Sequence, residues 1–190
     1  MNPKRRDFIA GAGLAVLGSA LPAGARTIRA ASASRTPARA GAGPRGLSRG
    51  IAAVLARAGE SMLPGAAAAG IAEFVGSQLA LPAHRQGLLI RYLMPGPHRS
   101  FYVAGLAALE AASLERFHRP FARLSDAQAG ELLEDLRNAR IPRWSGPPQP
   151  LLHFVLRNDA LDVVYGTRTG FARLGVPYMA HLEPPAGWPT

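Results

Sequence analysis

The chain has 190 residues and a formal net charge of +10, and its composition favours a helical domain over a β-sandwich. Apolar residues make up 48% of the chain but aromatic residues only 7%, and the abundant alanine forms helices better than strands. The chain has no cysteine, which excludes disulfides, thiolate catalysis, iron–sulfur ligation and haem attachment through Cys-x-x-Cys-His.

The basic charge lies mostly near the N-terminus. Residues 1–33 carry a formal charge of +4, residues 34–49 carry a further +4, and the rest of the chain carries only about +2 of the total of +10. A nucleic-acid-binding domain would instead concentrate its basic residues on the folded body. We therefore expect no nucleic-acid partner.

Residues 1–33 have the pattern of a twin-arginine signal peptide. Arg5 and Arg6 stand before an apolar run that ends at Leu21 and is too short to span a bilayer as a stable helix. Phe8 and Ile9 fit the Arg-Arg-x-Phe-Leu pattern that the twin-arginine translocon reads. We therefore expect export to the periplasm by this route.

Two features of the leader leave alternatives open. Lys4 and Ala10 depart from the usual twin-arginine pattern, so a general secretory signal or an N-terminal anchor is the competing interpretation. Cleavage is expected after Ala25, directly behind the apolar core, with Ala33 as the second small-residue site. An uncleaved leader would serve as an anchor.

Residues 34–46 are rich in Ala, Arg, Gly and Pro and predict a flexible linker. Residues 47–190 predict an irregular all-α bundle of five or six helices that ends in a loop-rich tail. Ser48 is the expected cap of the first helix, and Ser125 with Gln128 has the form of a capping box. The expected helices are at about 48–62, 67–79, 88–92, 99–117, 126–136 and 151–165, and residues 166–190 are expected to form loops.

The last long helix is expected to turn Phe154, Leu161, Val164 and Tyr165 toward the core. The acidic pairs Glu134–Asp135 and Asp159/Asp162 are interpreted as solvated helix faces. None of the five histidines is paired with another at the helical spacing of metal ligands. We therefore predict no catalytic residue, metal or cofactor in this chain.

The segment after the last long helix is the candidate partner interface. Tyr165, Phe171 and Tyr178 offer aromatic area, and Arg168 and Arg173 offer forked donors that suit carboxylates across an interface. The competing interpretation is that this segment folds back and covers the bundle's own core.

Several segments together resemble subunit 3 of gluconate 2-dehydrogenase, the small gamma-subunit family. They are Tyr102–Leu109, Arg116–Ser125, Asp162–Gly166 and Leu174–Tyr178. The likeness covers most of the chain from about Leu47 onward. Many members read Tyr-Gly-Gly-Asn where this chain has Tyr165-Gly166-Thr167-Arg168, and Phe171 is the expected counterpart of an aromatic residue that follows.

The resemblance implies a non-catalytic subunit of a flavin-dependent dehydrogenase that acts on a sugar or alcohol. It implies a flavoprotein partner of the glucose-methanol-choline class that carries FAD and a cytochrome c subunit that carries haem c. The small subunit would help the flavoprotein fold in the cytoplasm and carry it through the translocon to the periplasmic face of the inner membrane. The alternative is a self-sufficient periplasmic helical binding or membrane-associated protein.

Overall fold

The computed structural model describes residues 46–177, and every regular element in that range is a helix. The all-α prediction is therefore confirmed for this part of the chain. The signal peptide and nearly all of the linker lie outside the described residues and stay predictions. No helix among the described residues is long and apolar enough to cross a membrane. The helices are α1 (Arg49–Met62), α2 (Ile71–Leu79), η1 (Ala83–Arg85), α3 (Ile90–Leu93), α4 (His98–Phe117), η2 (Phe121–Arg123), α5 (Asp126–Arg137), α6 (Gln149–Tyr165) and α7 (Arg168–Leu174).

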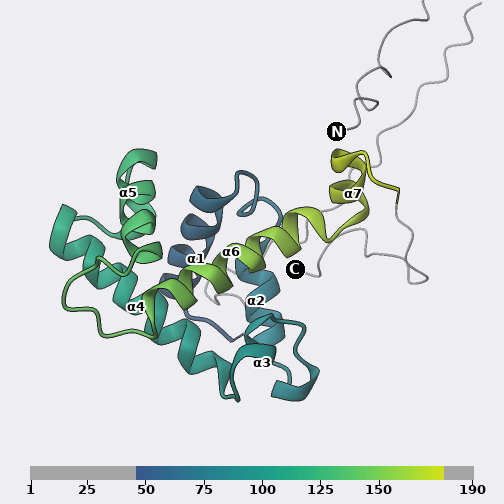
Figure 1. The fold of residues 1–190 in the computed structure, drawn as a ribbon, viewed down its shortest axis with the longest axis horizontal. Coiled ribbons are helices and arrows are strands. Elements are labelled where there is room, and N and C mark those ends of the chain that lie inside the picture. Colours follow the sequence, from purple (N-terminus) through teal and green to yellow (C-terminus); the bar gives the residue numbers. More distant parts are fainter. Residues whose placement is uncertain (1–45, 178–190) are drawn as a thin grey trace, which may run out of the picture. The chain divides into compact units, whose positions relative to one another are not determined.

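Helix α1 contacts α2, α4, α5, α6 and the η2 turn, and so forms the middle of the bundle (Figure 1). It begins where the sequence predicts, because the Ser48 Oγ accepts a hydrogen bond from the Ile51 N–H at 3.4 Å. Leu55 and Ala58 are fully buried on its inner face. At Gly59 a Cβ would lie 2.7 Å from the Ile71 Cδ1, so the missing side chain lets α2 approach closely.

Helix α2 begins later than the sequence predicts, at Ile71 instead of Ala67. The Glu60 carboxylate accepts hydrogen bonds from the Gly65 and Ala67 N–H groups, each at 3.0 Å, and holds this stretch as a turn. Gly70 then adopts a left-handed conformation with φ 83°, which an α-helix of L-residues does not accommodate. The turn between α1 and α2 is therefore fixed by one carboxylate and one glycine.

The predicted capping box at the start of α5 is confirmed. The Ser125 Oγ accepts from the Gln128 N–H at 3.3 Å, and the Gln128 Oε1 accepts from the Ser125 N–H at 3.2 Å. Two otherwise unpaired backbone donors are satisfied in this way.

Helix α6 buries a continuous face, but it is not the face that the sequence analysis chose. Val164 is buried as expected and Leu161 and Tyr165 are half-buried, whereas Phe154 is 49% exposed, so its predicted core position is wrong. The buried positions recur at helical spacing. One of them is the carboxylate Asp159, so the buried face does not stand out in the sequence as an apolar stripe. They are Gln149, Leu152, Val155, Leu156, Asp159, Ala160, Val163 and Val164.

A buried hydrogen bond joins α6 to α4. The Tyr102 hydroxyl donates to the Asp159 Oδ2 at 2.7 Å, and both side chains are fully buried. The expectation that Asp159 lies on a solvated face is therefore wrong. Burial raises the pKa of the Asp159 carboxyl to about 8, although the hydrogen bond from Tyr102 acts in the opposite direction. Burial also raises the pKa of Tyr102 well above its ordinary value.

The raised pKa of Asp159 predicts that stability falls as the pH rises. The unfolded carboxyl titrates near about 3.9, so between that pH and about 8 the native state binds the extra proton. The group's contribution is fully present below the lower value and is lost as the pH passes through the upper one. The free energy of unfolding should therefore fall between about pH 6 and pH 8, by at most about 1.4 kcal/mol per pH unit from this group.

Urea unfolding of the wild type and two variants across this range checks the prediction. Asp159→Asn should flatten the pH dependence, because the amide does not titrate. Tyr102→Phe should keep it and extend it to higher pH, because the hydrogen bond that lowers the pKa of Asp159 is gone. An Asp159→Asn variant with the wild-type slope would contradict the assignment.

Candidate partner interface

The segment after α6 is a helix rather than the predicted loop. Thr167 caps α7, and its Oγ1 accepts a hydrogen bond from the Gly170 N–H at 3.1 Å. α7 then ends at Gly175, which adopts the left-handed conformation with φ 64° that commonly closes a helix. The sequence contains both capping signals, Thr167 before the helix and Gly175 after it. The many other glycines and prolines of the tail led to the prediction of a loop instead.

Helix α7 packs directly against the backbone of the last turn of α6. A Cβ on Gly170 would lie 2.5 Å from both the Val164 carbonyl oxygen and the Tyr165 Cα. A Cβ on Gly166 would collide with the Asp162 carbonyl oxygen. Only glycine permits this backbone-to-backbone contact, so the angle between α6 and α7 is set by two residues without side chains.

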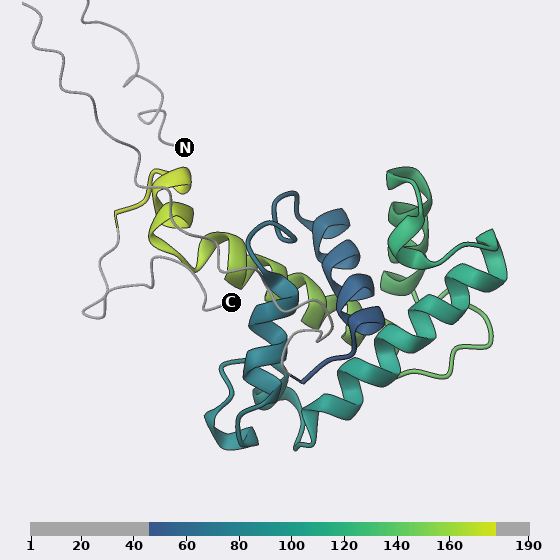
Figure 2. The same cartoon turned by 180° about the vertical axis from the view of Figure 1, so that it is seen from behind.

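We call α7 and the residues that flank it, Tyr165–Pro177, the α7 corner. Figures 1 and 2 show α7 at the C-terminal end of α6, on the side of the domain away from α5. Of the elements described, α6 is the one against which α7 mainly packs. A helix held in this manner presents most of its surface to solvent.

Four of the five predicted interface residues meet at this corner. Arg168 and Arg173 are exposed, and Tyr165 and Phe171 are half-buried. Tyr165 packs in part against the core, as the competing interpretation expected for the whole segment. Tyr178 lies outside the described residues.

Two exposed apolar residues of the α7 corner were missed as candidates. Leu174 is 51% exposed and Val176 is 52% exposed, on either side of the closing Gly175. Their signal in the sequence was the apolar-Gly-apolar-Pro element, which the resemblance marked without assigning it to a surface. Adjacent exposed apolar residues on a fixed backbone are a common feature of protein-binding surfaces.

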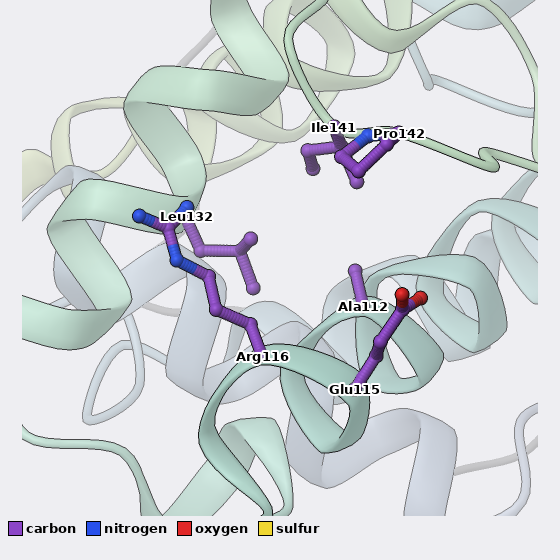
Figure 3. A pocket seen from close by; sticks show the side chains of 6 residues that line it. All are labelled: Ala112, Glu115, Arg116, Leu132, Ile141 and Pro142. Atoms are coloured by element: carbon purple, nitrogen blue, oxygen red, sulfur yellow. The ribbon is translucent and has the colours of Figure 1, made fainter.

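A hollow of about 320 Å³ lies between α4, α5 and the loop that follows α5 (Figure 3). Arg116 extends toward Leu132 and Glu115 points to the other side, with Ala112 between them. Its floor is apolar. The residues that line it are Ala112, Glu115, Arg116, Leu132, Ile141 and Pro142.

The charges at the rim of this hollow are neutralised within the chain. Glu115 pairs with Arg143, and Arg116 pairs with Glu131 and with the Asp135 Oδ2, the last at 2.6 Å. The hydrogen bond from Arg116 lowers the pKa of Asp135, so Asp135 stays ionised. The hollow therefore offers mainly apolar contact, with paired charges at its rim.

Of the four described histidines, His84 and His118 are exposed, His98 is buried and His153 is half-buried. His98 is buried with the side chain of Gln86, and burial lowers the pKa of the half-buried His153. Within residues 46–177 no group of three or more potential metal ligands comes together. The export-signal residues Arg5, Arg6, Phe8 and Ile9 lie outside the described range.

The described features are those of a small all-α domain with an exposed helical corner. The chain belongs to the gluconate 2-dehydrogenase subunit 3 family, whose model matches residues 49–180. The predicted resemblance is thereby confirmed, and the family is a subunit of a dehydrogenase complex. No curated protein and no solved structure gives a match to this chain.

The glycine contact at the α7 corner predicts a local effect of one methyl group. Gly170→Ala should displace α7 from α6, because the added Cβ meets backbone atoms that cannot rotate away. Hydrogen exchange of the α7 amides should become much faster, while the free energy of unfolding of the bundle changes by less than about 1 kcal/mol. The matched control is Gly130→Ala in α5, where nothing lies within 4 Å of the added Cβ. That variant should stabilise the helix by about 0.5–1 kcal/mol; unchanged exchange at α7 in Gly170→Ala would contradict the close contact.

Proposed function

We propose that this chain is the non-catalytic small subunit of a flavin-dependent dehydrogenase complex that acts on a sugar or alcohol. The observation that carries the proposal is family membership over residues 49–180. The family is named as a subunit of a dehydrogenase, and a subunit needs a surface for its partner. FAD would reside in a large flavoprotein of the glucose-methanol-choline class, and haem c in a cytochrome c subunit.

The proposed role is to help the flavoprotein fold and to escort it out of the cytoplasm. Flavin is inserted before export, so the cargo crosses the membrane folded, which suits the twin-arginine translocon. The Arg5–Arg6 pair would serve both chains if they share a stable interface beforehand, because binding to the folded state stabilises it by mass action. The complex would then act at the periplasmic face of the inner membrane.

The α7 corner is the proposed docking surface for the flavoprotein. Its backbone is fixed by Gly166 and Gly170, so little conformational entropy remains to be lost on binding. Leu174 and Val176 supply exposed apolar area, and Arg173 supplies a planar donor for a partner's carboxylate. An apolar centre beside an arginine is a frequent composition of interface hot spots.

A double variant tests the docking surface. Leu174→Ser with Val176→Ser should weaken binding of the flavoprotein by about 2 kcal/mol or more, because both side chains lose apolar contact with it. The melting temperature of the isolated subunit should stay nearly unchanged, since both residues are exposed. The measurement is co-purification from cells that express both chains, with the bound flavin quantified.

The matched control is Leu114→Ser with Phe154→Ser. These side chains are exposed to a similar degree, 45% and 49%, but lie on α4 and α6 outside the corner. The control should retain the flavoprotein. Equal retention by both double variants would place the interface elsewhere, and a wild-type subunit that never recovers a flavoprotein would favour the self-sufficient periplasmic protein.

The export role makes a separate prediction. Arg5→Lys with Arg6→Lys should leave both the subunit and the flavoprotein in the cytoplasm, because the translocon reads the arginine pair ahead of a mild apolar core. Cell fractionation followed by dehydrogenase assays on each fraction measures this. Continued delivery of the variant to the periplasm would mean the general secretory route and would overturn the twin-arginine assignment.

A further inference from the structure

The chain between α2 and α4 forms a second exposed corner. We call residues 81–99 the α3 corner, after the short helix at its tip. Leu88 and Ile90 are fully buried and anchor it to the core. The residues around them are almost all exposed, and Figures 1 and 2 show α3 well apart from α7.

A buried polar pair locks the backbone of the α3 corner. The His98 Nδ1 lies 2.6 Å from the Gln86 Oε1, and the His98 Nε2 lies 3.1 Å from the Met94 carbonyl oxygen. The Gln86 amide donates to the Leu81 carbonyl oxygen at 2.9 Å. Arg91 donates to the Gln86 carbonyl oxygen, also at 2.9 Å. These contacts tie three short segments into one surface of fixed shape.

The locked corner turns apolar side chains to solvent. Tyr92 is 71% exposed and Leu93 45% exposed, and Leu81 and Met94 are exposed beside the hydrogen bonds that hold their backbones. Covering these side chains would require the corner to move. The contacts of Gln86 and His98 oppose such a movement. An exposed apolar cluster on a fixed backbone is suited to contact with something outside the chain.

The charged residues within the α3 corner have one sign. No acidic residue occurs in residues 74–109, whereas Arg85, Arg91 and Arg99 are all exposed. The Arg91 guanidinium carbon lies 4.8 Å from the centre of the Tyr92 ring, so the cation and the aromatic ring are presented together. Whatever covers the α3 corner should therefore be both apolar and anionic.

We propose that the α3 corner docks on the surface of a lipid bilayer that contains anionic headgroups. Tyr92 and Leu93 would enter the boundary between headgroups and acyl chains, where tyrosine is favoured. The three arginines would remain at the level of the phosphates, with their apolar stems beside the chains. A protein partner would need carboxylates and a shape that fits a protruding tyrosine, whereas a bilayer supplies both chemistries without a matching shape.

Membrane docking by the α3 corner does not depend on the α7 corner. It concerns different residues and a different class of partner. A subunit that uses both surfaces would hold a bound protein next to the membrane. A result that excludes membrane binding by the α3 corner would leave partner binding by the α7 corner to be tested separately.

Vesicle co-sedimentation of the full-length chain tests the proposal. The wild type should bind phosphatidylglycerol vesicles more tightly than phosphatidylcholine vesicles, and added salt should weaken the difference. Arg85→Gln with Arg99→Gln should lower the partition coefficient on phosphatidylglycerol about tenfold or more. Tyr92→Ser with Leu93→Ser should lower it on both vesicle types.

Two matched variants serve as controls. Arg119→Gln with Arg123→Gln removes the same charge from exposed sites elsewhere, and Leu114→Ser with Phe154→Ser removes exposed apolar area elsewhere. Both should bind like the wild type. Because the leader is the same in every variant, equal losses in the control and corner variants would overturn the proposal. Corner variants that bind vesicles normally but lose the flavoprotein would also overturn it, because the surface would then be a protein interface.

A fluorescence probe gives an independent result. Tyr92→Trp should show a blue-shifted emission with phosphatidylglycerol vesicles, and lipids brominated on their acyl chains should quench it more strongly than they quench the wild type. A Tyr92→Trp protein that binds vesicles without added quenching would place the α3 corner in water and overturn the proposal.

Discussion

Close packing on glycine residues allows three pairs of helices in this domain to approach one another. Gly59 admits Ile71 of α2, and at Gly105 in α4 a Cβ would lie 2.6 Å from the Leu152 Cδ1 of α6. The same device places α7 on α6 through Gly170. At Gly170 the close atoms are backbone, so even alanine would displace α7. At Gly59 and Gly105 the close atoms are the side-chain ends of Ile71 and Leu152, which would have to shift to admit a methyl group. The buried Tyr102–Asp159 hydrogen bond and the large core leucines are accommodated within the spacing that these glycines set.

The sequence predicts much of this fold because most helix boundaries carry local signals. Ser48 and the Ser125–Gln128 box cap their helices as expected. Two of the errors occur where a side chain from outside the segment overrides local propensity. The Glu60 carboxylate holds the start of the expected second helix as a turn, and Asp159 occupies a core position because Tyr102, 57 residues away in sequence, provides its partner. Neither contact can be read from the spacing of apolar residues in a single sequence.

The candidate surfaces differ in how far the sequence could reveal them. The α7 corner was found from its composition, but its helical form and the exposure of Leu174 and Val176 follow from a contact between two backbones. The α3 corner was not found at all. Leu88, Ile90, Tyr92 and Leu93 are apolar or aromatic residues within one six-residue stretch. Only tertiary packing separates the two buried residues from the two exposed ones.

The attachment of α7 mainly to the last turn of α6 has an evolutionary consequence. In the proposed docking role, substitutions on its outer surface would change what the subunit recognises while the folding free energy of the bundle stays nearly constant. The choice of partner could then change without compensating changes in the core. Exposed residues such as Leu174 and Val176 would then be free to vary with the proposed partner, whereas Gly166 and Gly170 are constrained by the backbone atoms close to them and should resist change.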